Sequence, residues 1–175
     1  MDRVGERGAH ANRDRLVSGP ASVDVRWAGE GRFDATRTAG SPAIRLDSSG
    51  ETGPSPVDGL LASLASCVSV DVVEILTKRR TPPSSYIVHV RGDRVDTIPR
   101  RLERVTLGFV IAGEGIERVH TERAIYLAVN KYCSVRDSLR EDIPVEWTLT
   151  IEGENPGRTP SGSAIAGNAA GDARA

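Results

Sequence analysis

The segment from Ser55 to Arg80 constrains the fold more than any other part of the chain, because it predicts one long, almost wholly apolar helix. Ser55, with Asp58 three residues later, forms a capping box, and Pro56 occupies the favoured first helical position. A basic run at residues 78–80 complements the negative end of the helix dipole, and a pair of prolines follows it. We therefore expect a helix about 37 Å long at about 1.5 Å per residue.

The apolar residues of this helix fall on one face. They are Val57, Leu60, Leu61, Leu64, Cys67, Val68, Val72 and Ile75. Small residues lie beside this stripe, so the middle of the helix has little polar surface to present to water. They are Ala62, Ala65, Ser66 and Ser69. We expect a centrally buried helix, and its length favours a dimer that shares one core.

Alternating apolar and polar residues predict strands on both sides of the helix. The expected strands cover residues 23–27, 32–38, 43–47, 86–94, 102–111 and 145–152. A second helix is expected over residues 117–131, and a short third one over 135–139, with Ser134 as its cap. The order βββ-α-ββ-αα-β is an α+β pattern. We expect one folded domain over residues 21–152 and disordered tails over residues 1–20 and 153–175.

Composition excludes several classes of function. The formal net charge of −1 provides no general basic face for nucleic acid. No run approaches 18 consecutive apolar residues, so no membrane span or membrane partner is expected. The polar first residues do not resemble a secretory signal. We therefore expect a cytoplasmic protein, in which a lasting structural disulfide is not favoured.

Cys67 and Cys133 are the only cysteines, and they lie 66 residues apart. From the spacing alone, both could be small apolar core residues. The three histidines are scattered and there is no C-x-x-C pair, so we expect no metal site. No cofactor is expected either.

The sequence around these cysteines is more informative than their spacing. GPSPVDGLLASLASCVSVDVV surrounds Cys67, RAIYLAVNKYCSVRDSL surrounds Cys133, and VDVRWAGEGRF precedes both. These three stretches resemble the OsmC/Ohr family of osmotically induced and organic-hydroperoxide-resistance proteins, and in particular a less characterised branch of it. The resemblance implies an OsmC-like fold, with two wrapped antiparallel sheets around a long central helix in an intertwined homodimer.

The resemblance also implies a function, which is thiol-dependent reduction of organic hydroperoxides in antioxidant defence. In that reaction Cys67 would become a sulfenic acid, and Cys133 would condense with it to form a disulfide. A dithiol of the lipoyl type would then restore both thiols. The alternative is a non-enzymatic module of the same fold that binds a small hydrophobic ligand at the dimer interface.

The sequence departs from the family at its supporting carboxylate. Family members carry a Glu ten residues before the reactive cysteine, where this chain has Val57. Asp58 either replaces that Glu or serves only the capping box. Asp71, one turn after Cys67, is another candidate. An ionised Asp there disfavours a thiolate unless a nearby cation compensates its negative charge.

The family also uses an Arg from its first strands to stabilise the thiolate. Arg26, Arg32 and Arg37 all lie in that region, and we favour Arg32.

Overall fold

The structure, a computed structural model, describes residues 20–38 and 40–153. The predicted disordered tails lie outside these residues, apart from residues 20 and 153. The chain divides into two compact units, Met1–Pro56 and Val57–Ala175.

The N-terminal unit contains one antiparallel sheet in the order β1 (Val23–Trp27), β2 (Arg32–Arg37), β3 (Ile44–Asp47). Trp27 pairs with Phe33, which in turn pairs with Leu46 of β3. Because direct cross-strand partners share a face, this register collects the apolar side chains on one face of the sheet. That face is open: Trp27 is 70% exposed and Ile44 65% exposed.

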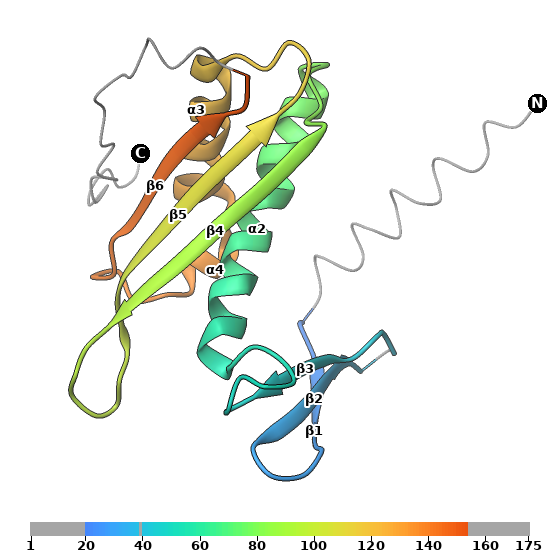
Figure 1. Ribbon diagram of the computed structural model, residues 1–175, viewed down its shortest axis with the longest axis vertical. Coiled ribbons are helices and arrows are strands. Elements are labelled where there is room, and N and C mark those ends of the chain that lie inside the picture. The colour runs from blue at the N-terminus through green and yellow to red at the C-terminus, as the bar shows by residue number, and fades with distance from the viewer. Residues whose placement is uncertain (1–19, 39, 154–175) are drawn as a thin grey trace, which may run out of the picture. The chain divides into compact units, whose positions relative to one another are not determined.

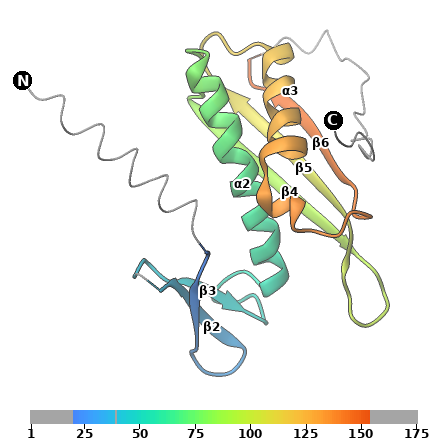
Figure 2. The same ribbon diagram turned by 180° about the vertical axis from the view of Figure 1, so that it is seen from behind.

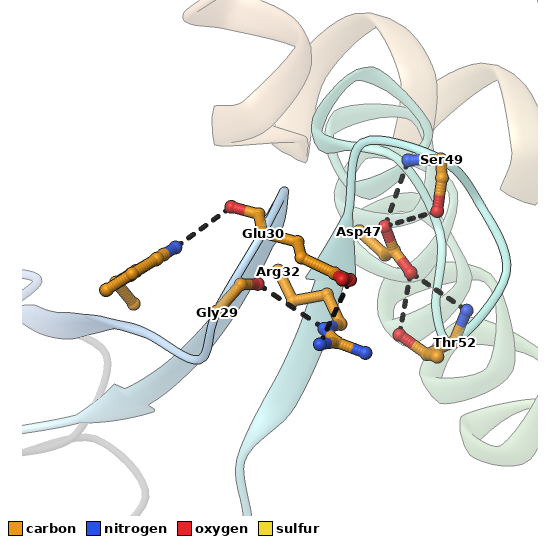
Figure 3. Close-up of polar contacts among 7 residues, drawn as sticks. Gly29, Glu30, Arg32, Asp47, Ser49 and Thr52 are labelled. Atoms are coloured by element: carbon orange, nitrogen blue, oxygen red, sulfur yellow. Dashed lines mark hydrogen bonds and ion pairs between the residues drawn. The ribbon is translucent and has the colours of Figure 1, made fainter.

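The loop after β3 is organised by one buried carboxylate (Figure 3). Asp47 is only 2% exposed, and its oxygens accept four hydrogen bonds. Ser49 donates from its amide (2.9 Å) and hydroxyl (2.8 Å), and Thr52 donates from its amide (3.0 Å) and hydroxyl (2.7 Å). These donors hold the pKa of Asp47 well below its usual range.

The C-terminal unit is built on a sheet in the order β4-β5-β6, and α2 and α3 both lie against one face of it (Figures 1 and 2). Its elements are α2 (Pro56–Lys78), β4 (Ser85–Arg94), β5 (Leu102–Ala112), α3 (Arg118–Leu127), the π-helix η1 (Ala128–Tyr132), α4 (Ser134–Asp137) and β6 (Val145–Ile151).

The α+β prediction is confirmed, but the expectation of purely antiparallel sheets is wrong for this unit. Strands β4 and β5 are antiparallel, whereas β5 and β6 are parallel. A parallel pair needs a long crossover connection, and α3, η1 and α4 together supply it.

The core of the unit lies between the sheet and its helices. As predicted, alternate residues of β5 point into it, and they are Val105, Leu107, Phe109 and Ile111. Helix α2 contributes a second set, which is Leu61, Leu64, Val68, Val72 and Leu76. Leu76 was absent from the predicted stripe.

Helix α2 is buried on one side only, so the expectation of a centrally buried helix is not met within the single chain. Val70 is 65% exposed, and Leu60 is exposed as well. By length and composition alone, α2 is the one helix in the described part that could cross a membrane. Its buried residues identify it as the core helix of its own unit.

The helix begins at Pro56 as predicted and ends at Lys78, two residues earlier than expected. Arg80 adopts a left-handed backbone with φ 66°, and its N–H bonds to the Thr77 carbonyl. The N–H of Thr81 bonds to the Leu76 carbonyl. A left-handed residue of this kind is a common way to end a helix.

Candidate active site

Cys67 lies in the middle of α2 and is half-buried. It packs against the core at the edge of the buried stripe, next to the open side of the helix. On that open side, residues spaced at helical intervals are small or apolar and exposed. They are Ala62, Ser63, Ser66 and Val70. Cys67 therefore stands at the boundary between the core and a surface that is uncovered in the single chain.

Cys133 lies where the second long helix changes its geometry. The α-helix predicted over residues 117–131 is regular only to Leu127, and η1 follows it. The N–H of Cys133 bonds to the Ala128 carbonyl at 3.0 Å, five residues back, which is a π-type bond. The side chain of Cys133 is buried in the core and only 3% exposed.

The prediction that Ser134 caps the next helix is wrong, because Cys133 occupies that position. The backbone of Cys133 is extended (φ −74°, ψ 100°), and α4 begins at Ser134. The sulfur of Cys133 accepts a hydrogen bond from the Arg136 amide at 3.3 Å. The thiol thus serves as the side-chain acceptor that a Ser or Asp usually supplies at this position.

The two cysteines meet although 66 residues separate them. Both are free thiols, and they interact through a side-chain hydrogen bond and an electrostatic contact. Burial raises the pKa of Cys133 to about 11; its contact with Cys67 adds to the rise, whereas the Arg136 amide opposes it. The amide at the start of α4 therefore favours the ionised thiol, but desolvation outweighs it.

The arrangement places two thiols side by side, one half-buried and the other almost wholly buried. The pair can therefore offer a nucleophile at Cys67 and hold a second thiol next to it.

The predicted cation, Arg32, lies in the N-terminal unit. Its guanidinium pairs with Glu30 at 3.1 Å and donates a long hydrogen bond of 3.4 Å to the Gly29 carbonyl (Figure 3). Arg26 and Arg37 belong to the same unit.

The predicted carboxylate, Asp58, lies in the first turn of α2. On a regular helix, nine residues place it about 180° around the axis from Cys67 and about 13.5 Å along it. This position favours the capping role over a role at the thiol.

Sequence reasoning missed η1, which determines where Cys133 lies. One signal was available in the sequence: the apolar period of the second helix stops at Val129, and Asn130 and Lys131 follow it. Among the described residues, no group of three or more His, Cys, Asp or Glu side chains is arranged to hold a metal ion.

Comparison with known proteins identifies the class to which this fold and thiol pair belong. The family model described as OsmC-like protein matches residues 48–148, more than half of the 175-residue chain. The chain therefore belongs to the OsmC-like protein family, as the resemblance predicted.

Individual relatives agree with this assignment. The chain is 28% identical over 127 residues to Protein YhfA of Escherichia coli strain K12, across 73% of this chain and 95% of YhfA. A hypothetical protein from Aquifex aeolicus VF5, whose crystal structure is known, is 27% identical in sequence. Its structure matches with a TM-score of 0.65, over 77% of this chain and 98% of that protein. The organic hydroperoxide resistance protein OhrB of Bacillus subtilis shares the fold at 14% identity, with a TM-score of 0.53 and coverage of 75% and 98%.

Proposed function

We propose that this protein reduces organic hydroperoxides, with Cys67 as the attacking thiol and Cys133 as the resolving thiol. The observation that carries the proposal is the direct contact between the two side chains. The shared fold supports it too, since some structural neighbours are named organic hydroperoxide resistance proteins.

In the first step the Cys67 thiolate attacks one oxygen of the hydroperoxide. A sulfur–oxygen bond forms, the oxygen–oxygen bond breaks, and the departing alkoxide takes up a proton to leave as an alcohol. Cys67 is oxidised to a sulfenic acid, and the hydroperoxide is reduced. Attack falls on Cys67 because it is half-buried, whereas Cys133 is almost wholly buried and protonated at neutral pH.

In the second step the sulfur of Cys133 attacks the sulfenic acid. A disulfide forms, and hydroxide leaves as water after taking up the Cys133 proton. A dithiol of the lipoyl type then reduces the disulfide by exchange, becoming a disulfide itself and restoring both thiols. A cytoplasmic location fits this cycle, because a reducing compartment supports the thiol forms.

Arg32, which is paired with Glu30 in the structure, is the cation that we assign to the thiolate. Arg32→Lys keeps the charge but loses the planar group, whereas Arg32→Met removes the charge. If the assignment is right, Arg32→Met slows oxidation of Cys67 more than Arg26→Met or Arg37→Met. Equal rates for all three variants would contradict it. For Asp58 we propose only a capping role at the start of α2.

We further propose that the active form is a homodimer. Two apolar surfaces of the chain are uncovered, namely the Trp27 face of the N-terminal sheet and the Val70 side of α2. Exposed apolar patches of this kind mark interaction sites. Because Cys67 borders the second surface, a partner chain there would enclose the thiol in an apolar environment suited to organic hydroperoxides.

The proposed function is tested by the intact mass of the reduced protein after a slight excess of cumene hydroperoxide, followed by alkylation without reductant. The expected product is lighter by two hydrogens and carries no alkyl group. Cys133→Ser should stop at a sulfenic acid that a dimedone probe traps on Cys67. Cys67→Ser should show no oxidation at all.

Two freely alkylated thiols after this treatment would contradict the reductase. That outcome would favour the binding module, which the open apolar surfaces and the absence of the family carboxylate at Val57 also support. In that case Cys67→Ser would leave binding of an apolar fluorescent probe unchanged.

A further inference from the structure

One carboxylate near Cys67 has no role in the scheme above. Asp71 follows Cys67 by four residues within the unbroken helix α2. Residues at this spacing lie on the same helix face, with about 5–6 Å between their Cβ atoms. Asp71 is half-buried rather than freely solvated. Asp71 therefore lies one helical turn from the thiol, on the same face of α2 and within the same half-buried region.

Among the residues that the structure describes, none forms an ion pair with Asp71. Lys78 is the cation that acts on it, but the Lys78 amino group is already paired with Glu74. Tyr132 of η1 also acts on Lys78, so these groups gather on the side of α2 that meets η1. Burial raises the pKa of Asp71, the negative charge of Glu74 raises it further, and Lys78 opposes both.

Hydroperoxide reduction needs a proton carrier at this place. The thiol of Cys67 must lose a proton before it attacks, and the departing alkoxide must gain one, because an alkoxide is a poor leaving group. A carboxylate beside the sulfur can accept the first proton and deliver it to the alkoxide. Such general acid–base catalysis contributes about 10²–10⁴-fold to a rate and works best when the carrier's pKa lies near the working pH.

We propose that Asp71 carries this proton, taking it from the Cys67 thiol and giving it to the alkoxide oxygen as the oxygen–oxygen bond breaks. The inference rests on the proposed reductase function and deepens it. Burial and the charge of Glu74 raise the pKa of Asp71 in the direction of neutral pH. It also limits the repulsion that a fully ionised Asp would exert on the thiolate.

The other acids near Cys67 fit this task less well. Asp58 lies about 180° around the helix from Cys67. Glu74 is paired with Lys78, and its negative charge acts on Asp71. The Cys133 thiol, with a pKa of about 11, holds its proton too tightly to exchange it near neutral pH.

The test compares three reagents whose leaving groups differ in their need for a proton. It uses full-length protein with Cys133→Ser, so that Cys67 is the single cysteine and one step is observed. Cumene hydroperoxide releases an alkoxide, whereas peroxybenzoic acid releases a carboxylate and iodoacetamide releases iodide, neither of which needs a proton. Stopped-flow rates are measured with and without Asp71→Asn, with Glu114→Gln in an exposed turn as the matched control and Asp71→Glu as the conservative variant.

Asp71→Asn should slow the cumene hydroperoxide reaction at least about 100-fold. The rates with peroxybenzoic acid and iodoacetamide should stay within about threefold or rise, because a negative charge has been removed beside the thiolate. Asp71→Glu should recover part of the lost rate, and Glu114→Gln should change little. In the protein with Asp71 intact, the ratio of the cumene hydroperoxide rate to the peroxybenzoic acid rate should fall as pH rises and the shared proton is lost.

Three outcomes would overturn the inference. An equal loss with all three reagents would give Asp71 a role in holding the thiol rather than in carrying a proton. An unchanged cumene hydroperoxide rate in Asp71→Asn would remove it from the step altogether. If Asp71→Asn fails to fold, a rate ratio that does not vary with pH in the protein with Asp71 intact would have the same meaning. Failure of the proposed function itself looks different: the protein with Asp71 would then react with iodoacetamide but not with cumene hydroperoxide.

Discussion

The two sheets of this protein differ in how far their apolar faces are buried. The β4-β5-β6 sheet covers its apolar face with α2 and α3, and Leu107 and Phe109 there are almost wholly buried (Figure 2). The β1-β2-β3 sheet has the same alternating pattern, yet its Trp27 is 70% exposed. An isolated sheet of three short strands has little core of its own. The buried apolar core therefore belongs to the C-terminal unit, whereas the N-terminal sheet buries little of its own apolar face.

The largest effect should come from a charge placed in the covered face. Leu107→Asp puts an unpaired carboxylate among fully buried side chains and should cost about 4 kcal/mol or more of unfolding free energy, much of a typical domain's stability. The matched control is Ile87→Asp, because the Ile87 side chain on β4 is 49% exposed. This substitution should change the free energy of unfolding by about 0.5 kcal/mol or less. Circular dichroism melts measure both, and equal losses would contradict the assignment of the core.

The same substitution on the open face should change association rather than folding. Trp27→Asp should raise the dimer dissociation constant at least about 100-fold, since buried Trp residues are typical binding hot spots worth about 2 kcal/mol or more. The secondary structure should stay intact. Sedimentation velocity over a dilution series measures the effect, with Asp24→Asn on the polar face of β1 as the control. A parent protein that is monomeric at every concentration would refute the homodimer.

A smaller effect is expected at the loop after β3. Because the folded pKa of Asp47 is depressed, its contribution to stability is present above the unfolded pKa of about 3.9 and is lost as pH falls towards the folded pKa. Asp47→Asn should lower the melting temperature at pH 7 and flatten its decline below about pH 4. Ser49→Ala, which removes one of the four donors, should give a weaker version of both changes. Parallel melting curves for Asp47→Asn and the parent across this range would contradict the role of the carboxylate.

The smallest effect should appear at alkaline pH. A thiol whose folded pKa is raised to about 11 stabilises the fold below its unfolded value of about 8.5, and that contribution is lost as pH rises towards 11. Cys133→Ala should therefore flatten the stability curve between about pH 9 and 11 relative to the parent. Tyr86, whose pKa burial raises to about 12, should lose its contribution at higher pH, and Tyr86→Phe separates the two. A melting series at several pH values tests both residues, and identical slopes would contradict the burial of Cys133.

The sequence predicted most of the elements because their signals are local. The capping pattern placed the start of α2 at Pro56, and strict alternation placed the buried face of β5. What it missed depends on long-range packing: the parallel pairing of β5 with β6 and the replacement of an α-turn by η1. The sequence identified both cysteines as a pair only through a resemblance to known proteins, since 66 residues of separation carry no local signal. The importance of Asp71 depends on burial and on the pairing of Lys78 with Glu74, which spacing alone does not reveal.

The π-helix η1 has a consequence for how this chain tolerates insertions and deletions. A π-turn accommodates one residue more than an α-turn over a similar rise, so it changes the direction in which every later side chain leaves the helix. If residues 128–132 formed α-turns at the same residue count, Cys133 would be turned by about 100° around the axis, away from Cys67. Removing one residue there would let α geometry return with little change in the direction of Cys133. The contact of Cys133 with Cys67 therefore depends on residue count as well as on residue type. Homologues aligned without regard to this extra residue would place the second thiol one position out of register.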